Sequence, residues 1–110
     1  MIFLNEIEIY RGTSSIRYLK IDGYEHDQDD VVTLTVKHNA LQSDYDIQKT
    51  ASYNAETGEY VFEFTPEDTE ELVPDRYFYD IGLQNGDDFY IVVPMANFDI
   101  LPTSTQRSVE

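Results

Sequence analysis

Acidic side chains are the residues of this sequence with the greatest potential for chemistry, and two clusters could hold a cation. Asp27-Gln28-Asp29-Asp30 and Asp87-Asp88 present carboxylate oxygens, which are the ligands that Ca²⁺ prefers. An EF-hand loop that began at Asp27 would need glycine at its sixth position and glutamate at its twelfth, but these positions hold Val32 and His38. We therefore expect solvated loop acids, with no bound metal and no cofactor.

Sites for nucleophilic or acid–base catalysis have little support in the sequence. The chain contains no cysteine, so disulfides, thiolate metal sites and cysteine nucleophiles are excluded. The two histidines, His26 and His38, fit no metal-ligand spacing and are predicted to be isolated surface residues. No Gly-x-Ser-x-Gly elbow occurs. Paired carboxylates for glycoside hydrolysis remain an alternative, but a chain of 110 residues without long loops has little room for a deep cleft, and we expect no catalytic residue.

The charge balance narrows the classes of partner. Seven Lys and Arg residues face 22 Asp and Glu residues, which gives a formal net charge of −15. Nucleic acids and anionic membranes both require clustered basic residues, so neither is an expected partner. The apolar run Met1–Leu4 is too short for a signal peptide, and no apolar stretch approaches the roughly 20 residues that span a bilayer. We expect a soluble chain that is made in a cytoplasm.

Alternating apolar and polar residues predict strands along most of the chain. The strand-forming segments, about seven in number, are residues 6–9, 15–21, 32–37, 45–53, 59–64, 76–81 and 89–100. Thr65-Pro66-Glu67-Asp68 has the order of a capped helix start, and Pro74 limits that helix to one or two turns. Short strands separated by turns every 8–12 residues are typical of a sandwich. The prediction is an all-β, immunoglobulin-like antiparallel sandwich over residues 1–101 and a disordered tail over 102–110; an OB-like barrel is the alternative.

Three residues are predicted to have structural roles. Asn85-Gly86 lies between two apolar runs, which is the strongest short hairpin signal, because a type I′ turn needs positive φ twice. Tyr77 begins a strand after a short helical corner, where immunoglobulin-like sandwiches place a tyrosine whose hydroxyl bonds to upstream backbone.

The chain also carries a set of short motifs that resembles a known family, the immunoglobulin-like N-terminal domains of phage baseplate upper proteins and related short tail or neck proteins. The resemblance implies a virion structural role without catalysis. Its motifs occur in order along most of the chain: Ile9-Tyr10-Arg11-Gly12-Thr13, Val32-Thr33-Leu34-Thr35-Val36-Lys37, Gly58-Glu59-Tyr60-Val61-Phe62, Asp68-Thr69 with Leu72, Tyr77-Phe78-Tyr79-Asp80-Ile81, Asn85-Gly86 and Phe98-Asp99-Ile100.

The last hairpin is the most informative feature, because it places apolar residues on a face that sandwiches usually keep polar. A two-residue Asn85-Gly86 turn would put Phe78, Phe89, Ile91 and Val93 on the outer side, since cross-strand partners share a face. A loop longer by one residue would instead expose Phe78, Tyr90 and Val92. Such a surface is either a partner interface or is covered by Met1–Leu4 or by the segment after Pro94. We expect the interface to consist of Phe78, Phe89, Ile91 and Val93.

Three functional hypotheses follow. The first is a non-catalytic structural or assembly protein of a phage tail, baseplate or neck, made in the bacterial cytoplasm, that acts in the virion by docking to protein partners as a homo-oligomer or a hetero-complex. The second is a carbohydrate-binding module or adhesin, suggested by nine tyrosines and weakened by the absence of tryptophan. The third is an acidic decoy that inhibits a basic enzyme, which only the charge suggests.

Overall fold

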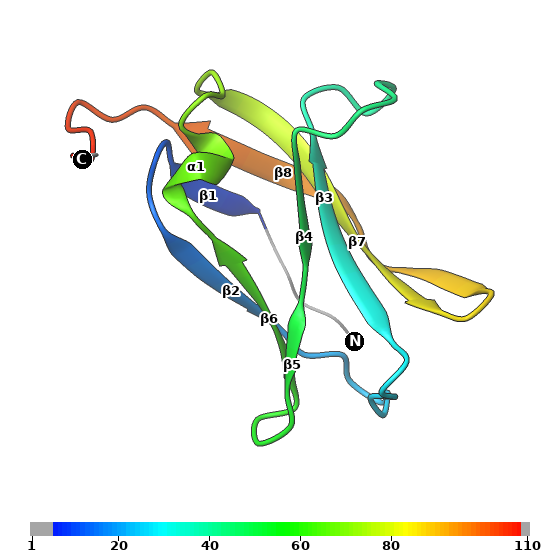
Figure 1. Cartoon of the computed structure of the whole chain (residues 1–110). Helices are drawn as coiled ribbons and strands as arrows, with labels where there is room; N and C mark the ends of the chain where they lie inside the picture. The colour runs from blue at the N-terminus through cyan, green and yellow to red at the C-terminus, as the bar shows by residue number, and fades with distance from the viewer. Residues whose placement is uncertain (1–5, 109–110) are drawn as a thin grey trace.

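Two β-sheets face each other in the computed structural model, which describes residues 6–108 (Figure 1). The five-stranded sheet has the order β1-β8-β7-β3-β4, and the three-stranded sheet has the order β2-β6-β5. The bounds are β1 Ile7–Tyr10, β2 Ser15–Leu19, β3 Val31–Lys37, β4 Ile47–Thr50, β5 Ser52–Asn54, β6 Glu59–Phe64, α1 Pro66–Thr69, β7 Asp75–Asn85 and β8 Asp88–Leu101.

This distribution of strands confirms the all-β, immunoglobulin-like sandwich. In immunoglobulin domains strands B, E and D form one sheet and strands C, F and G the other, as β2, β6, β5 and β3, β7, β8 do here. All pairings are antiparallel except that of β1 with β8, which is parallel. Within residues 6–108 the one helix is α1, which is far too short to cross a membrane.

The described residues contain eight strands, because the segment predicted as one strand over 45–53 divides at Ala51. Its first part, β4, pairs with β3, and its second part, β5, pairs with β6 of the opposite sheet. The backbone N–H of Ala51 donates to the carbonyl of Val32 at 2.8 Å at the crossing point. One extended segment therefore joins the two sheets at this edge.

Inward-facing side chains of both sheets form the core. Phe98 on β8 has no exposed surface, and its ring packs against Phe64 and Tyr79, with centroids 5.6 and 6.1 Å away. The predicted helix start is confirmed: α1 begins at Pro66, and the Asp68 carboxylate accepts the Thr65 N–H at 2.7 Å. Lys49 of β4 pairs with the same carboxylate at 2.8 Å, which ties the helical corner to the five-stranded sheet.

The C-terminal segment leaves β8 at Leu101 and returns to the helical corner. Thr103 donates to the carbonyl of Arg11, and Arg107 forms ion pairs with Glu67 and Glu70. Residues 102–108, predicted as a disordered tail, thus make specific contacts in the structure.

Candidate functional site

The turn of the last hairpin is not Asn85-Gly86, as the sequence suggested, but Gly86-Asp87. Asn85 pairs with Asp88 and so belongs to the ladder. Gly86 has φ of +58°, whereas no other residue type in the described chain has positive φ. Glycine in the first central position is the pattern of a type II′ turn, which suits the twist of a hairpin as well as type I′ does. The pairing of β7 with β8 is consequently shifted by two residues from the predicted pairing. Because side chains alternate with a period of two, each residue near the turn still points to its predicted face of the sheet.

Two bulges in β8 then change which side each residue faces. Gly82 pairs with Ile91 and Ile81 with Val93, so β8 has one extra residue between these pairs; a second extra residue lies between Val93 and Ala96, the partner of Tyr79. The second bulge contains Pro94, which has no N–H to donate to a ladder. One extra residue reverses the phase of a strand. Val93 is therefore buried against the core at 3% exposure, and its predicted place on the outer face is wrong.

An apolar hollow of about 330 Å³ lies on the outer face of the five-stranded sheet, over β3, β7 and β8. Its apolar lining comes from Phe78, Phe89, Ile91 and Met95, and its polar side comes from Thr35, Lys37 and Asp80. Phe89, Ile91 and Met95 are 61%, 50% and 55% exposed, so the hollow is open to solvent.

Three of the four predicted interface residues thus lie together, and one residue was missed. Met95 joins the group because the second bulge restores the phase that the first bulge reversed, so Met95 faces outward again. The segment after Pro94 does not cover the hollow, since it continues as β8 between β7 and β1. Met1–Leu4, the other predicted cover, lie outside the described residues.

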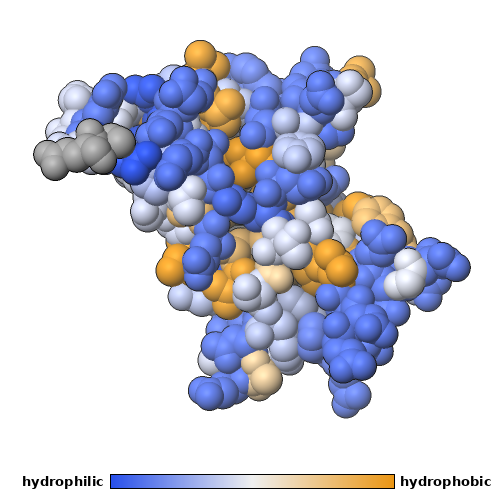
Figure 2. Space-filling model, in the orientation of Figure 1, coloured by the Kyte–Doolittle hydropathy of each residue, from blue (hydrophilic) through white to orange (hydrophobic). Residues whose placement is uncertain are grey.

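Gly82 determines how closely Phe89, which lines this hollow, approaches the sheet. It faces outward beneath the ring of Phe89, and a Cβ atom at this position would lie 2.7 and 2.8 Å from two atoms of that ring. The Phe89 ring can approach the sheet this closely because residue 82 has no side chain. Figure 2 shows further hydrophobic surface across the middle of the face that it presents and smaller hydrophobic patches near the top, whereas the lower end is mostly hydrophilic.

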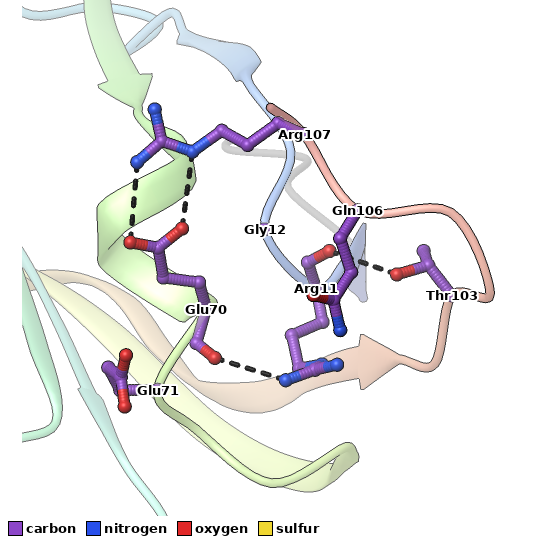
Figure 3. A pocket seen from close by; sticks show the side chains of 7 residues that line it. All are labelled: Arg11, Gly12, Glu70, Glu71, Thr103, Gln106 and Arg107. Atoms are coloured by element: carbon purple, nitrogen blue, oxygen red, sulfur yellow. Dashed lines mark hydrogen bonds and ion pairs between the residues drawn. The ribbon is translucent and has the colours of Figure 1, made fainter. Parts of the chain in front are cut away.

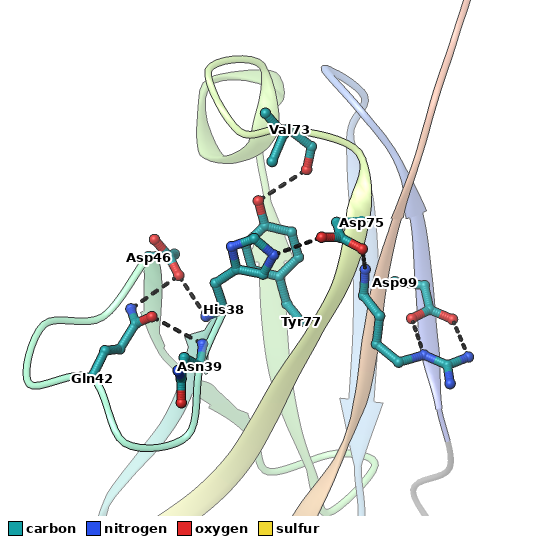
Figure 4. A network of polar contacts seen from close by, with 9 residues as sticks. His38, Asn39, Gln42, Asp46, Val73, Asp75, Tyr77 and Asp99 are labelled. Atoms are coloured by element: carbon teal, nitrogen blue, oxygen red, sulfur yellow. Dashed lines mark hydrogen bonds and ion pairs between the residues drawn. The ribbon is translucent and has the colours of Figure 1, made fainter.

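The opposite end of β7 carries the predicted tyrosine corner. The hydroxyl of buried Tyr77 donates to the carbonyl of Val73 at 2.9 Å (Figure 4), and burial raises the pKa of this phenol. His38 is exposed but not isolated: its ring stacks on Tyr77 at 4.2 Å and its Nε2 lies 2.8 Å from the Asp75 carboxylate. That hydrogen bond holds the pKa of Asp75 below its ordinary value. Through these two contacts His38 links Tyr77 to Asp75 and stabilises the corner.

Replacing Tyr77 with phenylalanine should lower the free energy of unfolding by about 1 kcal/mol, because the Val73 carbonyl loses its donor. Urea denaturation followed by circular dichroism measures this difference. Tyr45→Phe is the matched control, since Tyr45 is an exposed tyrosine, and it should leave the free energy of unfolding unchanged. Equal effects of the two substitutions would show that the Tyr77 hydroxyl contributes nothing to stability.

In the first predicted acid cluster Asp27, Gln28 and Asp29 are exposed, as predicted, whereas the Asp30 side chain is buried by its hydrogen-bond partners. The Asp30 carboxylate accepts hydrogen bonds from Tyr24 Oη at 2.7 Å, Asn85 Nδ2 at 2.8 Å and the Asp27 N–H at 2.9 Å. His26, which was predicted to be an isolated surface residue, is half-buried, stacks on Tyr53 at 3.7 Å and lies 3.8 Å from this carboxylate. The hydrogen bond to Asp30 raises the pKa of Tyr24 to about 12. The network connects the 22–30 loop to the last residue of β7.

A third polar region lies between α1 and the C-terminal segment (Figure 3). A hollow of about 260 Å³ is bordered by Arg11, Glu70 and Arg107, whose charged groups already bind one another or the backbone. Among the described residues, no group of three or more His, Asp or Glu side chains is arranged to hold a metal ion. The apolar hollow over β7 and β8 is therefore the candidate site.

Comparisons with known proteins address the fold. No family model matches the sequence, and no curated protein is significantly similar to it. Among the solved structures with a similar fold is a "putative glycoside hydrolase" from Bacteroides vulgatus ATCC 8482, with a TM-score of 0.54 and 14% sequence identity. The match covers 92% of this chain but only 17% of that one. At this level of identity the likeness shows the fold alone.

Proposed function

We propose that this chain is a non-catalytic docking domain that binds another protein through the outer face of β7 and β8. The observation that carries the proposal is the group of Phe78, Phe89, Ile91 and Met95 around one open hollow, on a face where sandwich domains usually place polar residues. Fully burying an exposed side chain of this size contributes about 1.5–3 kcal/mol, and since these side chains are already about half-buried, the group can supply on the order of 3–6 kcal/mol before ordering costs.

The setting that we propose is a phage virion, in the tail, baseplate or neck, after synthesis in the bacterial cytoplasm. This assignment depends on the resemblance of the sequence motifs to baseplate immunoglobulin-like domains. The net charge of −15 supports it in one respect, because repulsion between free subunits delays association until a complementary partner is present.

Replacing Ile91 with aspartate should weaken docking by at least about tenfold, because a buried unpaired carboxylate is costly. The chain is co-expressed with the products of the genes beside its own, and complexes are measured by size-exclusion chromatography with light scattering and by calorimetry. Ile16→Asp is the matched control, since Ile16 is 49% exposed on the three-stranded sheet. A complex that tolerates Ile91→Asp as well as Ile16→Asp would refute the proposal.

Carbohydrate binding is the second candidate, favoured by the likeness to part of a chain described as a glycoside hydrolase. Several tyrosines are exposed for stacking on sugar rings, among them Tyr10, Tyr18 and Tyr45. Glycan-array binding that Ile91→Asp leaves intact and Tyr18→Ala removes would favour this candidate over docking to a protein.

A further inference from the structure

The end of the β7–β8 hairpin exposes apolar side chains on both of its faces. Phe89 and Ile91 lie on the outer face, opposite Gln84 and Gly82, and Tyr90 lies on the inner face, opposite Leu83. Tyr90 is 55% exposed, close to the value for Ile91. A strand with one solvated face alternates apolar and polar residues, whereas a continuous apolar run is typical of a strand that is covered on both faces.

The inner face borders a second apolar hollow. Tyr90 and Val92 line it together with Leu83 and with Ile21 and Tyr24 of the loop after β2, and its volume is about 350 Å³. In Figure 1 the hairpin projects beyond the body of the sandwich, away from β2, β5 and β6. On this part of the inner face Leu83 is buried, whereas Tyr90 beside it stays half-exposed.

The turn of the hairpin carries negative charge next to these apolar side chains. Asp87 and Asp88 are both exposed there, and Asp80 borders the outer hollow. A second copy of the chain would bring like carboxylates together and would carry the same net charge of −15. Complementary charge guides association and excludes wrong partners. A protein that binds this hairpin is therefore expected to present lysine or arginine side chains to Asp87 and Asp88.

The hairpin is also held in position before any partner arrives. Asn85, the last residue of β7, donates from Nδ2 to the buried carboxylate of Asp30 at 2.8 Å. This bond fixes the base of the turn to the 22–30 loop. A projecting element that is already ordered loses little conformational freedom on binding, which favours affinity.

The geometry points to insertion of the β7–β8 hairpin into an apolar cleft of a different protein, with Lys or Arg side chains at the floor of that cleft. Phe89 and Ile91 contact one wall, Tyr90 and Val92 contact the other, and Asp87 and Asp88 meet the basic floor. This inference rests on the proposed docking function and adds the inner face and the charge of the partner.

The test uses the full chain and the purified products of the flanking genes, with dissociation constants measured by calorimetry. Ile91→Asp probes the outer face, Tyr90→Asp the inner face, and Ile16→Asp serves as control. Insertion predicts that both hairpin variants weaken binding by about tenfold or more and that the control does not. The double variant Asp87→Asn/Asp88→Asn should weaken binding by about threefold to tenfold, and raising the salt from about 50 to about 500 mM should weaken the wild-type complex as well.

The outcomes separate this inference from the function on which it rests. Loss of binding in Ile91→Asp with full binding in Tyr90→Asp would overturn insertion and leave docking through the outer face in place. Full binding by both variants, or no complex with any flanking product, would overturn both proposals. If the chain binds to itself and Tyr90→Asp breaks up that complex, the partner is a second copy and not a basic protein. Binding that does not change with salt would also contradict a basic partner. Thermal melting checks that each variant is folded, and Tyr90→Ser replaces Tyr90→Asp if the charge disturbs the fold.

Discussion

Replacing Phe98 with alanine should lower the free energy of unfolding by about 4 kcal/mol, the range observed for truncating a fully buried phenylalanine. Phe98 has no exposed surface and lies between Phe64 of the opposite sheet and Tyr79 of the neighbouring strand. Its removal would leave a cavity where the two sheets meet, since neither ring can move far in a packed interior. Urea denaturation followed by circular dichroism, with the slope held in common for both proteins, measures the difference.

Phe89 provides a matched control on the same strand. It is largely exposed over Gly82, so Phe89→Ala should change the free energy of unfolding by less than about 0.5 kcal/mol. The same substitution should weaken docking by about tenfold if the outer hollow is the binding surface. A large loss of stability in Phe89→Ala would show that Phe89 serves to stabilise the fold and is not available for binding a partner. A loss below about 1 kcal/mol in Phe98→Ala would contradict the sandwich core itself.

The fold was predictable because its determinants are local. Alternation locates the strands, and the Thr65-Pro66 helix start and the Tyr77 corner depend on residues close in sequence. The division of the 45–53 segment was not predictable. It depends on Ala51 meeting the Val32 carbonyl, a contact between residues far apart in the chain. Alternation continues through the crossing, so the sequence shows no break where the chain changes sheets.

The candidate site was predictable up to the first bulge. Phe89 and Ile91 lie on the outer face because a two-residue shift in register preserves the phase of a strand. Val93 faces inward and not outward because the first bulge inserts one residue into β8, and Met95 faces outward because the second bulge inserts another. Pro94 marked an irregularity in the sequence, yet it could not give the number of inserted residues. Two bulges restore the original phase, which is why Phe98 and Ile100 face inward.

Charged residues were the least predictable. Asp29 and Asp30 are adjacent and chemically identical, but Asp29 is exposed, whereas the Asp30 side chain has 0% exposure. The difference arises from the donors that the fold brings to Asp30 from Tyr24 and from the end of β7. Composition counts both residues as surface charge, and only the tertiary arrangement separates them.

Replacing Asp30 with alanine should lower the free energy of unfolding by about 2 kcal/mol, because Asn85, Tyr24 and Asp27 lose a charged acceptor whose own side chain is buried. Thermal and urea denaturation at neutral pH measure this loss. Asp29→Ala, in the same loop, is the matched control and should change the free energy of unfolding by less than about 0.5 kcal/mol. Because Asn85 would also be released, the hairpin should bind its partner more weakly than in the control.

The pH dependence of this difference tests its electrostatic origin. Burial acts to raise the pKa of Asp30, but the hydrogen bonds from Asp27, Asn85 and Tyr24 and the nearby His26 outweigh burial and hold it below the ordinary value of 3.8. The folded state therefore favours the ionised form. Its stabilisation is complete above the pKa of the unfolded chain and is lost as the pH falls through the lower pKa of the folded protein. The gap between wild type and Asp30→Ala should consequently be largest near neutral pH and shrink below about pH 4. A gap that is constant from neutral to acidic pH would attribute the effect of Asp30 to packing and not to its charge.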